Sequence, residues 1–268
     1  MGEHNDAPDW ALIPFSAKVW GAGFGAMIGT SLVSVAAQRF RSKAEQSLWS
    51  AATFAKVLAI TKTNLRVTYH PDFDKTRPSV FCQNHVNLVD AFTACASIPQ
   101  PFVGLMLAWH FKIPGYGWMM KATHGIPVHK GARRTELLCE AARERAADGL
   151  SILTFPEGHR TNDGQVQPFK RGVFFMARDS ALPVVSIAVR GMFEVNRKGS
   201  VLIRPGDVDV FVGPQIETAH LDDDGVTTLA ANLRDAMSAY VNGDDVGGER
   251  IAALALPTAK PFDVTSSR

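Results

Sequence analysis

The sequence predicts an α/β protein with a mostly parallel central sheet flanked by helices and an N-terminal membrane-docking helical hairpin. Short apolar strands alternate with helical segments over most of the chain, which is typical of a parallel sheet covered on both faces. An uncharged apolar run stands near the N-terminus. Apolar residues make up 46% of the 268 residues, which is enough for a large core and excludes global disorder.

Net charge and hydropathy narrow the class of protein further. The net charge is only +2, whereas a dedicated nucleic-acid-binding protein usually presents a strongly basic face, so no nucleic-acid partner is expected. The mean hydropathy of −0.01 is high for a fully soluble enzyme. It indicates that part of the apolar content faces lipid.

Cysteine and histidine spacing gives no sign of a metal or a disulfide framework. The chain has three cysteines, Cys82, Cys95 and Cys139. They form no CxxC pair, which disfavours a zinc site or a set of disulfides and indicates a reducing compartment. The histidines His124, His129 and His159 match no common spacing of metal ligands, so no metal site is predicted.

The N-terminal region contains two apolar stretches that predict helices. Val19–Ala37 has no charged residue and is close to the length that a helix needs to cross a hydrocarbon core. Leu48–Ile60 is interrupted by Lys56 and is typical of an amphipathic helix. The pair is compatible with a hairpin that dips into one leaflet, with one span plus a surface helix, or with a hairpin packed on the globular domain.

Small and basic residues add detail to this region. Gly21, Gly25 and Gly29 recur every four residues, so on a helix they form a smooth stripe that another helix can approach closely. Three basic residues follow the apolar run, namely Arg39, Arg41 and Lys43. By the positive-inside rule these residues, and the domain that follows them, are expected on the cytoplasmic side.

The expected strands are short apolar runs bounded by turn-forming residues. In chain order they are Ser79–Cys82, Phe102–Leu107, Gly125–His129, Leu150–Phe155, Pro183–Val189, Val201–Arg204 and Val208–Val212. The expected helices lie between and after them, at Leu88–Ser97, Tyr116–Ala122, Arg134–Asp148, Gly172–Asp179 and Thr227–Tyr240. Leu150–Phe155 is predicted as a continuous apolar strand, Arg134–Asp148 as a clear helix, and Thr227–Tyr240 as an amphipathic helix.

These segments divide the chain into three parts. Residues 1–62 form the membrane-associated helical segment, residues 63–242 the α/β domain, and residues 243–268 a tail that is rich in Gly, Asp and Pro and expected to be loose. In sheets of this kind the chemistry lies where strands end and loops begin. Two polar clusters stand at such places.

The first cluster, Asn84–Asp90, follows a predicted strand and opens a predicted helix. On a regular helix His85 and Asp90 would point about 140° apart and could not meet. They can meet if His85 lies in the turn before the helix and Asp90 in its first turn, with Asn87 as the N-cap. The Asp90 carboxylate would then hold one imidazole nitrogen and leave the other free to accept a proton. The alternative is a simple capping interaction between Asn87 and Asp90.

The second cluster, Phe155–Arg160, also follows a predicted strand. Pro156 ends the strand and Gly158 permits a sharp turn, so that Glu157 and Arg160 project from a loop. Further cations stand at the same edge of the sheet, namely Lys130, Arg133, Arg134, Lys170 and Arg171. They predict a pocket for a phosphate or another anion, and the alternative is a solvated basic surface.

The two clusters, in this order, resemble the glycerolipid acyltransferase family, whose best-known members are the 1-acyl-glycerol-3-phosphate acyltransferases. The family's first motif, Asn-His-x4-Asp, is matched by Asn84, His85 and Asp90. Its third motif, Phe-Pro-Glu-Gly-x-Arg, is matched by Phe155–Gly158 and Arg160. Each motif is modest alone, but the two together are specific.

Other segments extend the resemblance to about residues 65–215. Leu182–Val185 looks like the family's later apolar-Pro-apolar motif, and Phe169–Gly172 is also similar to the family. The N-terminal helical pair resembles the membrane-docking hairpin of bacterial members. The second motif departs from the family, because Gly125–Lys130 has Val128 in place of Phe and Lys130 in place of Arg. Lysine offers a point charge rather than a bidentate fork, which leaves the acceptor open.

The resemblance implies an acyltransferase in which His85 is the general base on an acceptor hydroxyl and Asp90 fixes the tautomer of its imidazole. The donor would be a thioester co-substrate, acyl-CoA or acyl-ACP (acyl carrier protein), and no other cofactor is implied. The acceptor would be a lysophospholipid, above all 1-acyl-glycerol-3-phosphate, which gives phosphatidic acid. Backbone N–H groups near Asn87 would stabilise the oxyanion. The residues implied in substrate binding are Asn84, Lys130, Glu157, Gly158, Arg160 and Lys170.

Two other interpretations stay open. The chain could act on a different lysolipid, such as another lysophospholipid or an ornithine-type lipid, or transfer acyl groups between lipids. It could also be a non-catalytic membrane lipid-binding protein, although the intact His85 and Asp90 argue against this. The expected partners are membrane lipids, and the expected location is the membrane, with the catalytic domain on the cytoplasmic face. Cys82 is expected to be a buried strand residue rather than a nucleophile.

Overall fold

A seven-stranded sheet forms the centre of the molecule. The computed structural model describes residues 9–129, 134–244 and 247–255. The strands are β1 (Asn64–Tyr69), β2 (Val80–Gln83), β3 (Phe102–Leu107), β4 (Ile126–Val128), β5 (Ser151–Thr154), β6 (Val184–Arg190) and β7 (Asp207–Val212). Their order is β1-β7-β6-β2-β5-β3-β4, and neighbouring strands are parallel except β6 and β7. The predicted α/β class with a mostly parallel sheet is confirmed.

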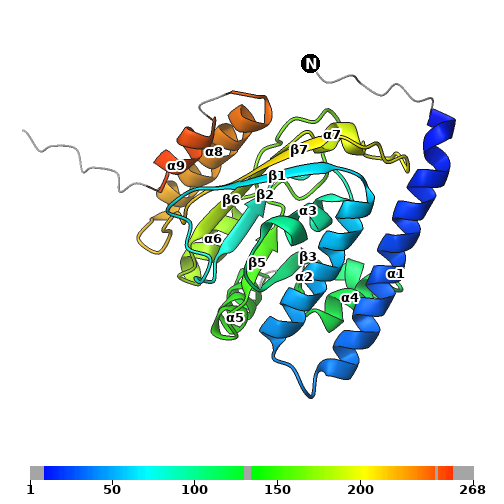
Figure 1. Cartoon of the computed structure of the whole chain (residues 1–268). Helices are drawn as coiled ribbons and strands as arrows, with labels where there is room; N and C mark the ends of the chain where they lie inside the picture. Colours follow the sequence, from blue (N-terminus) through cyan, green and yellow to red (C-terminus); the bar gives the residue numbers. More distant parts are fainter. Residues whose placement is uncertain (1–8, 130–133, 245–246, 256–268) are drawn as a thin grey trace, which may run out of the picture.

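Helices cover both faces of this sheet (Figure 1). They are η1 (Asp9–Leu12), α1 (Ile13–Ala37), α2 (Lys43–Ile60), α3 (Asp90–Ser97), η2 (Ala108–Lys112), α4 (Tyr116–Ala122), α5 (Arg134–Ala147), α6 (Gly172–Asp179), α7 (Met192–Val195), α8 (Asp223–Val241) and α9 (Gly247–Ala253). Helices α5, α6, α8 and α9 form the core on one face of the sheet. Helices α1, α2, α3 and α7 contribute to the core on the other face.

Side chains alternate between these two cores along the central strands. In β2, Val80 and Cys82 belong to the core on the α6 and α8 side, whereas Phe81 belongs to the core on the α3 side. In β5, Ile152 and Leu153 divide between the two cores in the same way. Strands buried on both faces read in the sequence as continuous apolar runs, which is why their positions can be predicted.

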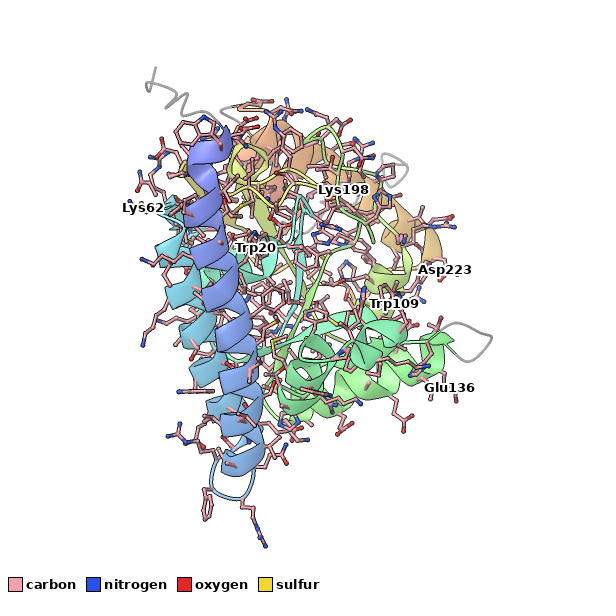
Figure 2. All side chains as sticks on the ribbon, turned by 90° about the vertical axis from the view of Figure 1, so that its right-hand side faces the viewer. Trp20, Lys62, Trp109, Glu136, Lys198 and Asp223 are labelled. Carbon is pink, nitrogen blue, oxygen red and sulfur yellow. The ribbon has the colours of Figure 1, made fainter. Side chains whose placement is uncertain are left out.

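Helices α1 and α2 form a hairpin along one side of the molecule (Figure 1 and Figure 2). Helix α2 begins at a capping box, in which the Glu45 N–H donates to the Ser42 hydroxyl and the Ser42 N–H donates to the Glu45 carboxylate. Lys43 pairs with Asp148 at 2.7 Å, which ties the start of α2 to the end of α5. One of the three basic residues after the apolar run is therefore engaged within the chain.

Helix α1 buries small and polar residues and exposes large apolar ones. The buried residues are Ser16, Val19, Gly23, Thr30, Ser31 and Ser34. The exposed large apolar residues are Ile13, Phe24, Ile28, Leu32, Val33 and Val35. This is the reverse of the pattern of a helix that packs on a globular domain in water.

The glycine of α1 that meets other helices is Gly23 rather than the predicted stripe. A Cβ on Gly23 would lie 3.5 Å from Phe92 of α3. A Cβ on any glycine of the stripe, namely Gly21, Gly25 and Gly29, would meet nothing within 4 Å. Among the described residues no helix approaches this stripe, so the expected close approach is not made there.

The predicted strand Val201–Arg204 is wrong. Ile203 is fully buried, but its N–H donates to the hydroxyl of Ser16 in α1, at 2.8 Å. Trp20 of α1 donates in turn to the Val201 carbonyl at 2.7 Å. The segment thus packs on a helix instead of pairing with a strand, and a short apolar run such as Val201–Ile203 has the same appearance in both cases.

Part of the tail that was expected to be loose is helical. Gly247–Ala253 forms α9, because Ile251 is fully buried in the core beside α8. Gly247 allows this packing, since a Cβ there would lie 2.5 Å from the backbone nitrogen of Tyr240.

Candidate active site

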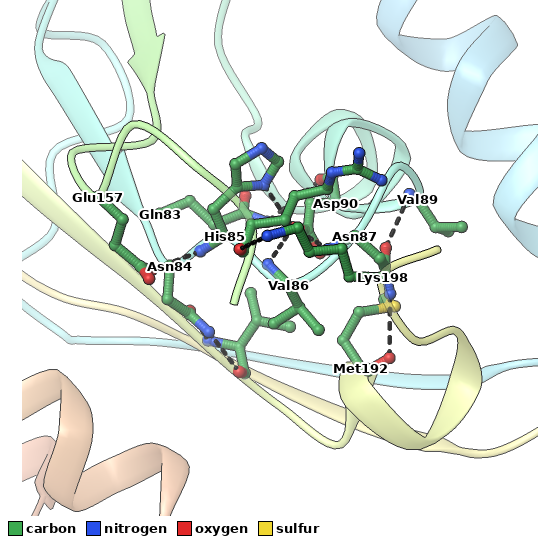
Figure 3. A network of polar contacts seen from close by, with 12 residues as sticks. Gln83, Asn84, His85, Val86, Asn87, Val89, Asp90, Glu157, Met192 and Lys198 are labelled. Atoms are coloured by element: carbon green, nitrogen blue, oxygen red, sulfur yellow. Dashed lines mark hydrogen bonds and ion pairs between the residues drawn. The ribbon is translucent and has the colours of Figure 1, made fainter. Parts of the chain in front are cut away.

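His85 and Asp90 lie together after the carboxyl end of β2. His85 Nδ1 is 2.8 Å from Asp90 Oδ2. A carboxylate only accepts hydrogen bonds, so Nδ1 carries the proton and Nε2 is the nitrogen able to accept one. Asp90 is fully buried and the His85 side chain is 22% exposed. The imidazole therefore connects a buried carboxylate to the surface. Figure 3 shows the contact between the His85 ring and Asp90.

The turn between β2 and α3 brings these two residues together as the sequence predicts, but its hydrogen bonds and the start of the helix differ from the prediction. Asp90 Oδ2 also accepts hydrogen bonds from the backbone N–H groups of Val86, at 2.6 Å, and Asn87, at 2.9 Å. Helix α3 begins only at Asp90, so the predicted N-cap at Asn87 is wrong. The reason is that the Asp90 carboxylate, reaching back, satisfies the amides of the turn.

These contacts occupy amides that were expected to stabilise an oxyanion. The N–H groups of Val86 and Asn87 donate to Asp90, and the N–H of Val89 donates to Asn87 Oδ1 at 2.8 Å. The expectation that amides around Asn87 are oxyanion donors is therefore wrong for these three groups.

An aromatic contact fixes the imidazole from a second side. The rings of His85 and Phe155 are stacked, with centroids 4.1 Å apart and planes inclined by 22°. Phe155 follows β5, the neighbour of β2 in the sheet. The two polar clusters of the sequence thus meet at this ring pair.

Glu157 joins the second cluster to the backbone of the first. Its Oε1 accepts a hydrogen bond from the His85 N–H at 2.7 Å, and its Oε2 accepts one from the Gln167 N–H at 2.9 Å. The residue is only 1% exposed. Burial raises the pKa of its carboxyl to about 7, although the two N–H donors act in the opposite direction.

Asn84 connects the end of β2 to β6. Its Nδ2 donates to the Val189 carbonyl at 3.0 Å, and its Oδ1 accepts from the Val189 N–H at 2.8 Å. Asn84 is buried. Its amide therefore imitates one backbone pair of a β-ladder and extends the pairing of the two strands toward His85.

Two of the predicted anion-binding side chains belong to the loop after β5. Gly158 has a φ of +72°, which favours glycine, and a Cβ there would overlap the ammonium group of Lys170. Lys170 thus lies against the loop that carries Arg160. Neither cation forms an ion pair with a carboxylate of the described residues. Lys130 and Arg133 lie outside the described residues.

A further cation, Lys198, stands at the same place, and no sequence motif points to it. Its Nζ donates to the Arg160 carbonyl at 3.0 Å. Figure 3 shows its side chain directed at the turn that carries His85. Lys198 lies in an exposed segment after α7 and comes near His85 only through the fold.

Cys82 is next to the site but cannot supply a nucleophile. It is fully buried in β2, and burial raises the pKa of its thiol far above the ordinary value. This confirms the predicted role as a buried strand residue. In the part of the chain that the structure describes, no three His, Cys, Asp or Glu side chains are grouped to hold a metal ion.

Residues 62–190 match the Acyltransferase family of protein domains. These residues form an acyltransferase domain. The domain contains both polar clusters, from Asn84 to Arg160, as well as Lys170, and ends before Lys198. The resemblance that the motifs suggest is thereby confirmed.

Relatives of the acyltransferase domain share one name. The chain is 33% identical over 171 residues to a 1-acyl-sn-glycerol-3-phosphate acyltransferase of Chlamydomonas reinhardtii, and the alignment covers 62% of this chain and 49% of that protein. It is 26% identical over 201 residues to the 1-acyl-sn-glycerol-3-phosphate acyltransferase alpha of Mus musculus, with coverage of 72% and 70%. The chain spans about half the length of the algal relative.

A solved structure shares the fold around the acyltransferase domain. The crystal structure of the 1-acyl-sn-glycerophosphate (LPA) acyltransferase PlsC from Thermotoga maritima superposes with a TM-score of 0.73 at 16% identity. The superposition covers 88% of this chain and 100% of that one. It therefore includes residues on both sides of residues 62–190.

Proposed function

We propose that this protein transfers a fatty acyl group from a thioester to the free hydroxyl of a lysophospholipid. The observation that carries the proposal is the hydrogen-bonded pair of His85 and Asp90 in an acyltransferase domain. The acceptor is 1-acyl-glycerol-3-phosphate and the product phosphatidic acid, in keeping with the names of the algal and mouse relatives. The donor is acyl-CoA or acyl-ACP.

In this reaction His85 is the general base. Its Nε2 takes the proton of the acceptor hydroxyl while the oxygen attacks the carbonyl carbon of the thioester. A C–O bond forms and gives a tetrahedral oxyanion, which collapses as the C–S bond breaks. The proton on Nε2 passes to the leaving thiolate, so the products are an ester and a free thiol. His85 returns to its neutral form.

Asp90 orients the imidazole and stabilises its charged form. Its carboxylate keeps the proton of the neutral ring on Nδ1 and favours the imidazolium that forms during proton transfer. The same oxygen accepts hydrogen bonds from the amides of Val86 and Asn87. The carboxylate is thus already in position before the reaction begins, which lowers the cost of reorganisation.

Glu157 and Asn84 act as positioning residues in this proposal. Both are buried, and Glu157 accepts from the backbone N–H of His85, whereas Asn84, the residue before His85, bonds the backbone of Val189. The described members of the predicted substrate set that are left for direct contact are Gly158, Arg160 and Lys170. The two cations, which have no carboxylate partner among the described residues, suit the phosphate of the acceptor.

A membrane location follows from the substrate and is supported by α1. The helical segment Asp9–Ala37 is long and apolar enough to cross a membrane, with a mean hydropathy of 1.5. Several of its large apolar side chains, among them Phe24, Ile28 and Leu32, are exposed, and contact with lipid would bury them. Arg39 and Arg41 follow the helix and are exposed, so the catalytic domain is assigned to the cytoplasmic face.

An acyl-transfer assay with a panel of acceptors tests the function. The purified full chain in detergent receives radiolabelled acyl-CoA and, in separate reactions, lysophosphatidic acid or lysophospholipids with other head groups. We expect product with lysophosphatidic acid. Product with another lysolipid alone would keep the chemistry and overturn the acceptor. No product with any acceptor, from acyl-CoA or from acyl-ACP, would overturn the proposed function.

A further inference from the structure

Lys198 lies outside the residues that match the Acyltransferase family, yet two independent sets of contacts connect it to His85. We propose that Lys198 binds the phosphate group of the acceptor and so contributes to the choice of substrate. This inference rests on the proposed function, because it takes the acceptor to be a phosphate-bearing lysolipid.

The first connection runs through a single peptide group. The carbonyl of Arg160 accepts a hydrogen bond from Lys198 Nζ at 3.0 Å. The N–H of the same peptide group, that of Thr161, donates to the His85 carbonyl at 2.9 Å. Because a peptide group is planar and rigid, this pair of contacts fixes the ammonium close to the turn that carries the proposed base.

The second connection runs through Asn87 in that turn. Its Nδ2 donates to the carbonyl of Asn196 at 2.7 Å. Asn196 is buried, and its own side chain donates to the carbonyls of Ser200, at 3.0 Å, and Leu202, at 2.9 Å. These bonds close the loop that carries Lys198 and attach it to the turn between His85 and α3.

Of the neighbouring cations Arg197 and Lys198, Lys198 is the one whose N–H groups can still bind an anion. An ammonium group has three N–H donors, and the Arg160 carbonyl takes one of them. No carboxylate of the described residues pairs with Lys198. Its neighbour Arg197, by contrast, pairs with Glu194 at 3.2 Å and lies over the ring of Phe193.

The loop of Lys198 is attached to α1 as well. Trp20 donates to the Val201 carbonyl, and Ser16 accepts from the Ile203 N–H; Figure 2 shows Trp20 and Lys198 from the side of α1. The loop of Lys198 is thus hydrogen-bonded both to the helix proposed to contact lipid and to the turn of His85. A lysolipid entering from the membrane would present its phosphate to this loop and its hydroxyl to His85.

Equilibrium binding to the full chain in detergent micelles tests the proposal without turnover. The probes are radiolabelled lysophosphatidic acid and a monoacylglycerol of the same chain length, which lacks the phosphate. The variants are Lys198→Gln, Lys198→Arg, which restores the charge, and Arg197→Gln as a matched loss of charge one residue away. We expect Lys198→Gln to weaken lysophosphatidic acid binding about tenfold, as for loss of a charge-assisted hydrogen bond, and the other two variants to bind nearly as the wild type does.

Binding of the monoacylglycerol should be the same in all four proteins. Equal affinity of wild type and Lys198→Gln for lysophosphatidic acid, equal weakening of both probes, or no binding to the wild type would each overturn the proposal. A Lys198→Gln variant that loses affinity for acyl-CoA instead would assign the lysine to a donor phosphate and also overturn it. The wild type could bind lysophosphatidic acid in a manner that depends on Lys198 and yet transfer no acyl group. That result would uphold the phosphate site and contradict only the proposed function.

Discussion

The carboxylate of Glu157 accepts a hydrogen bond from the backbone N–H of His85, although 72 positions separate the two residues. The loop that carries Glu157 makes a second hydrogen bond to His85, in which the Thr161 N–H donates to the His85 carbonyl. His85 is therefore held by both of its backbone polar groups, while Asp90 and Phe155 hold its ring. A neighbouring loop, rather than the turn itself, determines much of the position of the proposed base.

Replacement of Glu157 by glutamine should affect turnover rather than acceptor binding. Glutamine keeps the size of the side chain, but its NH2 group would face the backbone N–H of either His85 or Gln167. One of the two hydrogen bonds to the side chain would therefore be lost. We expect kcat for acyl transfer to fall roughly tenfold or more, with the KM for the acceptor within about twofold of the wild type. Steady-state kinetics with varied lysophosphatidic acid measure both. A raised KM with unchanged kcat would show instead that Glu157 binds the acceptor.

The raised pKa of Glu157 also predicts how stability depends on pH. The pKa is about 7 in the folded protein and near the ordinary value of 4.5 in the unfolded chain. Between these pH values the folded state binds more protons, so this group makes the free energy of unfolding fall as the pH rises from about 4.5 to 7. Urea unfolding across this range should show a shallower fall in Glu157→Gln. The same pH dependence in both proteins would contradict the prediction.

Asn84→Ala should lower stability, because it leaves two backbone groups of Val189 without partners in a buried place. Each buried unsatisfied group costs about 1–3 kcal/mol, so we expect a loss of roughly 2–5 kcal/mol in the free energy of unfolding. Asn242→Ala, at an exposed asparagine, is the control and should change it by less than about 0.5 kcal/mol. Denaturant unfolding measures both. A loss as small as that of the control would contradict the view that the Asn84 side chain stabilises the junction of β2 and β6.

The outward face of α1 should govern attachment to lipid. Ile28 and Leu32 are exposed and apolar, so their replacement by glutamine disturbs little packing within the described chain but weakens insertion into a bilayer. We expect the Ile28→Gln, Leu32→Gln double variant to float with liposomes several-fold less than the wild type, with unchanged thermal stability. Leu137→Gln, at an exposed leucine of α5, serves as the control. Equal flotation of the double variant and the wild type would exclude α1 as the lipid contact.

The parts of the fold that the sequence predicts are those with a local signal. The central strands are continuous apolar runs, and the polar residues of the site stand in short motifs directly after them. β1 is absent from the prediction because it is an edge strand with half-buried residues, although the alternation of Leu65 and Val67 was a usable sign. The start of α3 is misplaced because Asp90, five residues after His85, takes over the amides of the turn.

Other features depend on contacts between distant segments and have no local signal. The segment that carries Lys198 is held beside the turn of His85 by the bonds of Asn87 and Asn196, two residues that are 109 positions apart. Val201–Arg204 has the composition of a strand, but Ser16 and Trp20 of α1 take the backbone groups that a strand would have paired. Neither arrangement can be read from the segment itself.

The most direct test of the central claim is acyl transfer by His85→Ala with and without added imidazole. The substitution removes the proposed base and the contact with Phe155, while Asp90 keeps its bonds to the backbone. We expect the variant to be folded, by circular dichroism, to show no measurable transfer to lysophosphatidic acid, and to recover partly when imidazole replaces the missing base. Transfer by His85→Ala at the rate of the wild type, without imidazole, would contradict the central claim.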